Sequence, residues 1–201
     1  MDGGVARKGN DQIVITIVSG LPRSGTSLMM QILAAGGMTL LTDLERKPDA
    51  DNPRGYCEWE PAKLLPKQPD RIDEAEGKVV KVISQLVLSV PEGRIYKVIF
   101  MERPLSEVLA SQDEMLRRRG RSDFVSHDLM IPAFKEHLGE VNSWLGTQKN
   151  ISVHGVGYRQ MLSDPAGSSQ AIKNFLALDL DLDVEAMARQ VEPSLYRNRR
   201  P

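Results

Sequence analysis

The sequence has few of the residues that build disulfide frameworks and metal centres. It contains one cysteine, Cys57, so no intrachain disulfide can form. That usage is typical of a reducing compartment, and we expect a cytoplasmic protein. The three histidines, His127, His137 and His154, are scattered, and no CxxC pair is present. Because metal sites need ligands at close spacing, we predict neither a structural nor a catalytic metal.

Net charge and long apolar runs are also lacking. The formal net charge is −1 and the isoelectric point is about 6.3, which gives no electrostatic basis for binding nucleic acids or anionic membranes. The uncharged stretch Ser24–Thr42 is interrupted by Gln31, Gly36 and Gly37, and its apolar part is shorter than the ~20 residues of a membrane span. Residues 1–11 lack the apolar core of a secretory signal, and we expect a flexible leader there.

Apolar runs alternate with helical spacing along the rest of the chain. The β-rich runs predict strands at 13–18 (IVITIV), 78–83 (KVVKVI), 96–101 (YKVIFM) and 151–156 (ISVHGV). Helices are predicted at 26–35, after Pro104, around 134–145, and from Asp164 and Pro165 onward. This alternation predicts a single α/β domain over residues 12–201, with a parallel sheet of about four to five strands flanked by helices in a P-loop-like three-layer sandwich. Ligands of such sheets lie at the carboxyl ends of the strands.

The first predicted strand runs into a glycine-rich segment, SGLPRSGTSLMM. Gly20 and Gly25 are five residues apart, and glycines let a backbone wrap closely around an oxyanion. The helix predicted from Thr26 directs its free N–H groups toward the same place. Arg23 adds a positive charge, and Ser27 adds a hydroxyl. We favour an anion-binding loop over a tight turn with incidental glycines.

The loop differs from that of nucleotide hydrolases, which follows the pattern GxxxxGK[ST]. Thr26 occupies the lysine position, so a site for β- and γ-phosphates and Mg²⁺ lacks its usual cation. The third strand ends in Glu102, which could imitate the acidic Mg²⁺ ligand of a kinase or ATPase. A P-loop nucleotide kinase or ATPase therefore remains an alternative function.

The segment GLPRSGTSLMM resembles the PRSGTT loop of the sulfotransferase superfamily, in the form carried by tyrosylprotein and many bacterial members. The resemblance extends from Ile13 to about Leu178. In this family the loop binds the 5′-phosphosulfate end of 3′-phosphoadenosine 5′-phosphosulfate (PAPS). Its basic residue, here Arg23, stabilises the bridging oxygen as the sulfuryl group departs and 3′,5′-ADP is released. The resemblance implies that the loop residues bind PAPS: Leu21, Pro22, Arg23, Ser24, Gly25, Thr26 and Ser27.

A second segment, ERPLSEVLAS, resembles the 3′-phosphate motif of the same family. Arg103 ends a predicted strand, and Ser111 follows eight residues later, about 12 Å along a helix axis. In the family these two residues hold the 3′-phosphate, and a guanidinium fork with a hydroxyl suits a phosphate monoester. Taken singly, Arg103 fits a surface ion pair and Ser111 a solvated helix face. Their spacing in a strand–helix context favours the binding interpretation.

Two further segments resemble family motifs in part. GYRQMLSDP is similar to a segment whose tyrosine, here Tyr158, lies near the adenine, although Arg159 and Gln160 replace an acidic pair. KVVKVI matches the pattern of a lysine-containing segment of cytosolic members, which implies a catalytic role for Lys81. Ile83 stands where those enzymes keep a catalytic histidine, so that base is absent. For Tyr158, a half-buried aromatic at a strand end is the alternative.

The general base is then expected to be a carboxylate. Glu45, Glu58 and Glu60 are candidates, and we prefer Glu58 because NPRGYCEWEP resembles an NPxGYxE segment of bacterial sulfotransferase-like proteins. A solvated loop carboxylate is the alternative for each of the three. By resemblance, a basic residue near the C-terminus covers the 3′-phosphate: Arg197, Arg199 or Arg200. The other basic run, RRRGR at 117–121, is interpreted as a solvated face.

The predicted function is thus a PAPS-dependent sulfotransferase that moves the sulfuryl group to a hydroxyl or amine. The acceptor is a small molecule, a glycan or a peptide. Because the chain is shorter than many family members, a lid over the acceptor is reduced or is supplied by a partner subunit, so a homodimer is considered. Besides the kinase or ATPase, a non-catalytic 3′,5′-ADP-binding module on the same fold stays open, because the histidine is missing.

Overall fold

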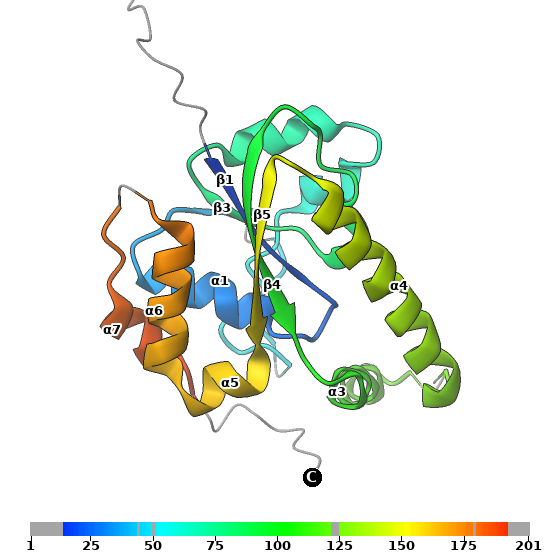
Figure 1. Cartoon of the computed structure of the whole chain (residues 1–201). Helices are drawn as coiled ribbons and strands as arrows, with labels where there is room; N and C mark the ends of the chain where they lie inside the picture. Colours follow the sequence, from blue (N-terminus) through cyan, green and yellow to red (C-terminus); the bar gives the residue numbers. More distant parts are fainter. Residues whose placement is uncertain (1–13, 44, 50, 122–124, 179, 193–201) are drawn as a thin grey trace, which may run out of the picture.

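A computed structural model describes residues 14–43, 45–49, 51–121, 125–178 and 180–192. Its centre is a five-stranded parallel sheet in the order β2-β3-β1-β4-β5 (Figure 1). The sheet confirms the predicted α/β class with a parallel sheet. The strands are β1 (Val14–Gly20), β2 (Leu40–Leu41), β3 (Val79–Lys81), β4 (Ile95–Glu102) and β5 (Ile151–Gly157).

The two central strands determine where the functional loops meet. β1 and β4 pair over seven residues, from Val14 opposite Ile95 to Gly20 opposite Met101. Both strands are apolar and largely buried, as strands covered on both faces are. Because their carboxyl ends are level, the glycine-rich loop that follows β1 and the segment that follows β4 leave the sheet side by side.

Two apolar layers cover the sheet. On one face lie α1 (Thr26–Ala35), α5 (Tyr158–Ser163), α6 (Pro165–Leu176) and α7 (Val184–Arg189), which share one core cluster with the sheet (Figure 1). The other cluster contains residues of η1 (Glu60–Leu64), η2 (Pro69–Ala75), α2 (Ser84–Val87) and α4 (His127–Thr147). α3 (Leu105–Arg118) follows β4 and contacts α4. These layers form the three-layer sandwich.

Most predicted elements are present, with shifted ends. The predicted strands at 78–83 and 96–101 correspond to β3 and β4, and β2 adds a short strand beyond the four apolar runs. The helix expected around 134–145 begins at His127 and continues through Pro132. Asp164 caps α6 by accepting a hydrogen bond from the Gly167 amide at 2.9 Å. The flexible leader predicted at 1–11 lies outside the described residues.

The sequence predicts no membrane span, and the lengths and hydropathy of the helices bear on this prediction. Within the described ranges, none of the helices combines the length and the apolar character that crossing a bilayer requires.

Candidate functional site

A cavity of about 880 Å³ lies at the carboxyl ends of β1, β3 and β4. It is lined by segments that directly follow these strands. From the predicted binding set it includes Pro22, Arg23, Gly25, Thr26, Ser27, Lys81, Arg103, Ser111 and Tyr158. Residues from four separate sequence segments therefore surround one space, as expected for a ligand at this edge of a parallel sheet.

The glycine-rich loop is closely packed against its surroundings. Gly20 and Gly25 have φ values of 139° and 109°, which L side chains rarely adopt. A Cβ on Gly20 would lie 2.7 Å from the Met101 carbonyl oxygen, and a Cβ on Gly25 would lie 2.6 Å from a ring carbon of Tyr158. Both positions therefore require glycine. The non-glycine Arg23 also has a positive φ, of 74°, a conformation that often marks functional loops.

The start of α1 suits an anion. Gly25 occupies the N-cap position, no side chain caps the helix, and its first turn contains no acidic residue. Amide groups at the beginning of a helix, with the positive end of its dipole, attract phosphate and sulfate groups. The Thr26 and Ser27 side chains belong to this first turn and line the cavity. The start of the helix therefore presents backbone N–H donors and two hydroxyls to a ligand.

The side chains of the two predicted motifs touch. Arg23 Nε donates a hydrogen bond to Ser111 Oγ at 3.0 Å, across 88 residues of sequence. A second Arg23 nitrogen reaches the Asp51 carbonyl oxygen at 3.4 Å. Ser111 is buried on α3 with 4% exposure, so it does not belong to a solvated face. The pair from separate motifs forms one polar wall of the cavity.

Arg103 is also directed at the loop. Its NH1 donates to the Arg23 carbonyl oxygen at 3.0 Å, which fixes the guanidinium at the loop. Its Nε donates to Glu107 Oε2 at 3.0 Å. The guanidinium lies 4.4 Å above the centre of the Tyr158 ring, within the range of cation–π attraction. Arg103 is therefore held on three sides, with only 7% of its side chain exposed.

A buried carboxylate holds this arginine. Glu107 is fully buried, and its second oxygen, Oε1, accepts from Arg159 Nε at 2.6 Å. Two guanidinium groups on one carboxylate compensate its desolvation. Arg159, which departs from the acidic pair of the motif that this segment resembles, is thus engaged in an ion pair with Glu107.

Tyr158 has a supporting place in this arrangement. One edge of its ring packs against Gly25, and the guanidinium of Arg103 lies over the ring face. The residue is only 9% exposed. Contact with an adenine therefore stays a prediction, whereas packing of the ring against the loop is observed.

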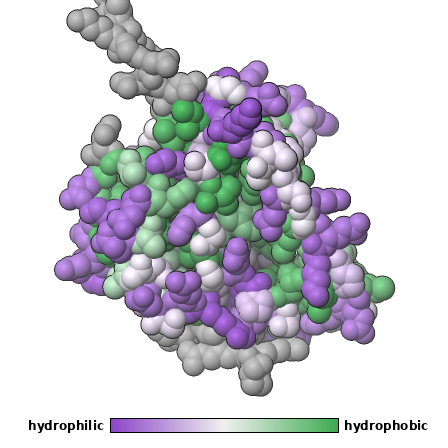
Figure 2. All heavy atoms as spheres, in the orientation of Figure 1, coloured by the Kyte–Doolittle hydropathy of each residue, from purple (hydrophilic) through white to green (hydrophobic). Residues whose placement is uncertain are grey.

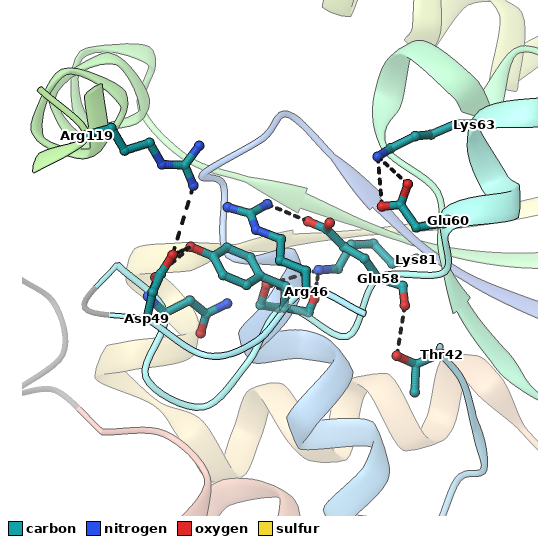
Figure 3. Close-up of polar contacts among 11 residues, drawn as sticks. Thr42, Arg46, Asp49, Glu58, Glu60, Lys63, Lys81 and Arg119 are labelled. Carbon is teal, nitrogen blue, oxygen red and sulfur yellow. Dashed lines mark hydrogen bonds and ion pairs between the residues drawn. The ribbon is translucent and has the colours of Figure 1, made fainter. Parts of the chain in front are cut away.

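Lys81 lies deep in the cavity wall. Its Nζ donates to Ser27 Oγ at 3.0 Å and to the Tyr56 carbonyl oxygen. Burial lowers the pKa of the Lys81 ammonium to about 8, although the charge of Glu58 opposes this shift. Figure 3 shows Lys81 beside Glu58 and Arg46. Near pH 7 the ammonium group is still mostly charged, and it lies beside the loop that would bind the anion.

The pKa of Lys81 predicts a pH-dependent stability. In the unfolded chain a lysine has a pKa near 10.4, so burial of the ammonium is costly below about pH 8, and the cost disappears as the pH rises toward 10.4. Relative to Lys81→Met, the wild-type protein should therefore gain about 2 kcal/mol of unfolding free energy between pH 7.5 and pH 10. Urea denaturation of both proteins at the two pH values measures this. A difference that stays constant with pH would contradict it.

The three candidate bases occupy different environments, and Figure 3 shows two of them, Glu58 and Glu60. Glu58 lines the cavity and accepts a hydrogen bond from Arg46 NH1 at 2.9 Å. Glu60 also lines the cavity and pairs with Lys63 at 2.6 Å. Glu45 is exposed and is not part of the cavity wall. Glu58 and Glu60 thus have access to a ligand in the cavity.

Other predicted residues lie away from the cavity surface. Leu21 and Ser24 are 3% and 2% exposed, and neither lines the cavity. The Ser24 amide closes the turn by donating to the Leu21 carbonyl oxygen at 3.0 Å. Their side chains shape the loop rather than face a ligand. The three arginines proposed to cover a 3′-phosphate, at 197, 199 and 200, lie outside the described residues.

Sequence reasoning missed several charged residues of the cavity wall. Arg118 and Arg119 line the cavity, although the basic run that contains them was interpreted as a solvated face. Arg118 pairs with Asp51 at 2.8 Å, and the Asp51 side chain is only 6% exposed. The spacing of the sequence does indicate a place for Arg118 in the cavity wall. Arg118 is seven residues after Ser111, which places both on one face of α3.

The kinase alternative requires an acidic metal ligand. Glu102 is exposed, does not line the cavity, and places its carboxylate over Gly155 of β5. In the part of the chain that the structure describes, no three histidine, cysteine, aspartate or glutamate side chains cluster so as to hold a metal ion. Glu102 is therefore not placed as a Mg²⁺ ligand for this cavity.

Comparison with solved structures identifies the fold of the chain, whereas sequence comparisons find no match. No known family profile matches the chain, and no curated protein matches its sequence. Sulfotransferase STF1 from Mycobacterium tuberculosis H37Rv superposes with a TM-score of 0.56 at 18% identity, over 92% of this chain and 73% of that chain. The sulfotransferase domain of the curacin biosynthetic pathway superposes with a TM-score of 0.50 at 13% identity, over 94% of this chain and 78% of that chain. The chain therefore has a sulfotransferase-like fold.

Another solved structure that is similar to this chain is an unliganded sugar kinase from Janibacter sp. HTCC2649. It has a TM-score of 0.46 and 12% identity over 84% of this chain and 96% of that chain. A likeness at that level carries no argument for function.

Proposed function

We propose that this protein is a PAPS-dependent sulfotransferase. The observation that supports the proposal best is the convergence of Arg23, Arg103 and Ser111 on one cavity, with Arg23 bonded to Ser111 and Arg103 bonded to the loop. A nucleotide with a phosphosulfate at one end and a phosphate monoester at the other needs donors from both motifs in one site. The fold likeness to sulfotransferases is consistent with this.

The donor set fits the ligand. The α1 N-terminus, with the Thr26 and Ser27 hydroxyls, is suited to the 5′-phosphosulfate. Arg103 and Ser111 are suited to the 3′-phosphate, which carries close to two negative charges. Arg118, which sequence reasoning missed, adds a further cation to the same wall. A cavity of about 880 Å³ is at the upper end of the roughly 300–1,000 Å³ of ordinary ligand sites.

The chain's own residues then have definite roles. When bound, PAPS supplies an activated sulfuryl group: the acceptor oxygen forms a bond to sulfur, the bond from sulfur to the bridging oxygen breaks, and its electron pair stays on 3′,5′-ADP. Arg23 and Lys81 stabilise the negative charge that develops on that bridging oxygen. Both cations are held in place by hydrogen bonds in the wall, so little reorganisation is needed.

Glu58 is the proposed general base. Its carboxylate lines the cavity and takes the proton that the acceptor hydroxyl loses. Arg46, which donates to Glu58 Oε1, orients the carboxylate. Arg46 is itself fixed by Tyr56, whose ring centre lies 3.3 Å from the guanidinium carbon. Glu60, the other candidate base that lines the cavity, is engaged by Lys63 and is the alternative base.

A comparison of three ligands tests the proposal. The protein is heated with 3′,5′-ADP, with 5′-AMP, or with ATP and Mg²⁺. At 100 times its Kd, a ligand adds about 2.7 kcal/mol of stability, which for a chain of this size raises Tm by about 5–10 °C. We expect that shift with 3′,5′-ADP, and a much smaller one with the other two at equal concentration. A larger shift with ATP and Mg²⁺ would favour the kinase or ATPase instead.

A further inference from the structure

Beyond the proposed nucleotide-binding residues, one part of the cavity wall consists of apolar side chains. Five half-buried side chains from three helical segments form it, and we call this part the apolar arm: Ile83 and Leu86 from α2 and its N-cap, Met115 from α3, and Met130 and Phe134 from α4. Large apolar side chains that line a cavity indicate a place where apolar ligand surface is buried.

The walls of the apolar arm are tied to each other. Ser84 Oγ, fully buried, lies 2.9 Å from His137 Nε2, which joins α2 to α4. Leu86 is two residues beyond Ser84, and Phe134 is three residues before His137, one helical turn away. The Ser84–His137 contact thus fixes the segments that carry Leu86 and Phe134 relative to each other, so the apolar arm is a built feature of the fold.

The apolar arm adjoins the place of transfer. Met115 follows Ser111 by four residues, so both lie on one face of α3. Ile83 follows Lys81 by two residues at the end of β3. Ser111 contacts Arg23, and Lys81 contacts Ser27. A molecule in the apolar arm therefore lies next to the residues assigned to the phosphosulfate end of PAPS.

We propose that the apolar arm binds the acceptor, and that the acceptor carries its hydroxyl on an alkyl or aryl body rather than on a sugar. The inference rests on the proposed function, because that function makes the neighbouring molecule an acceptor. A sugar in this place would have several hydroxyls against apolar side chains, which leaves buried polar groups without partners and is unfavourable. An alkyl or aryl body buries apolar surface there and leaves one hydroxyl for Glu58.

The N-terminal end of α4 is also hydrophobic, but its exposed surface is separate from the apolar arm. Leu129 is 70% exposed and does not line the cavity, and Figure 2 shows hydrophobic residues at this end of the helix. Because Leu129 precedes Met130 on the same helix, it provides a matched control: a ligand that binds exposed apolar surface will depend on Leu129, and a ligand in the apolar arm will depend on Phe134.

A chain-length series tests the proposal. 1-Butanol, 1-hexanol and 1-octanol are titrated by calorimetry into the protein, with and without saturating 3′,5′-ADP, and methyl α-D-glucoside serves as the polar probe. Burying one CH₂ is worth about 0.8 kcal/mol, which is about fourfold in Kd. We expect Kd to fall about fourfold per added CH₂, and no measurable binding of the glucoside.

Variants locate the binding. Phe134→Ser should weaken 1-octanol binding at least tenfold, whereas Leu129→Ser should leave it unchanged, with the Kd of 3′,5′-ADP the same in both. Affinity that is independent of chain length, stronger binding of the glucoside, or dependence on Leu129 instead of Phe134 would overturn the proposal while 3′,5′-ADP binding stands. If 3′,5′-ADP does not bind, the proposed function fails first, and the acceptor assignment fails with it even where the alkanol series holds.

Discussion

Glu107→Gln should lower the free energy of unfolding by about 3–5 kcal/mol. The carboxylate is fully buried between Arg103 and Arg159, and removal of its charge abolishes its buried ion pairs with both guanidinium groups. Glu114→Gln is the matched control on the same helix, because Glu114 forms partly exposed pairs with Arg117 and Arg118. Such pairs contribute about 1 kcal/mol or less. Urea denaturation of the three proteins at pH 7 measures both effects.

The same variant has a consequence for binding. If Glu107 positions Arg103, Glu107→Gln should weaken 3′,5′-ADP much more than 5′-AMP, since only the former carries the phosphate assigned to Arg103. Calorimetry below the unfolding temperature of the variant separates this from lost stability. Glu107→Asp should recover part of the discrimination, because it keeps the charge at a shorter reach. Equal weakening of both nucleotides would assign Glu107 a purely structural role.

Arg23→Met should slow the release of 3′,5′-ADP from PAPS by about 10²–10³-fold. The expected size is that of losing one preorganised group that stabilises charge developing in a transition state. With water as the acceptor, release can be followed by chromatography without knowledge of the natural acceptor. Arg117→Met, an exposed residue outside the cavity, should release 3′,5′-ADP at the wild-type rate. An Arg23 variant as active as Arg117→Met would remove Arg23 from the mechanism.

The parts of the fold that were predictable depend on local patterns. The apolar runs of β1 and β4 are long, buried on both faces, and paired over seven residues, so hydrophobicity alone indicates them. Gly20 and Gly25 are recognisable by their five-residue spacing after an apolar run, and the structure shows that Met101 and Tyr158 leave no room for a side chain there. The two-residue strand β2 had too little sequence of its own to be seen.

The parts of the site that were not predictable depend on contacts between distant residues. Arg159 and Glu107 are 52 residues apart, and no spacing rule connects them. The depressed pKa of Lys81 arises from burial beneath Tyr56 and Ser27, which only the packed structure reveals. Arg118 was misjudged for a similar reason: a basic run is usually solvated, but the segment that contains Asp51 lies across this one.

The central claim is that one cavity distinguishes the 3′-phosphate of an adenosine nucleotide. Isothermal titration of the wild-type protein with 3′,5′-ADP and then with 5′-AMP, at one ionic strength, measures this directly. Because two charge-assisted groups, Arg103 and Ser111, are assigned to that phosphate, the account predicts at least about 100-fold tighter binding of 3′,5′-ADP, on the order of 3 kcal/mol. Equal dissociation constants for the two nucleotides would contradict it.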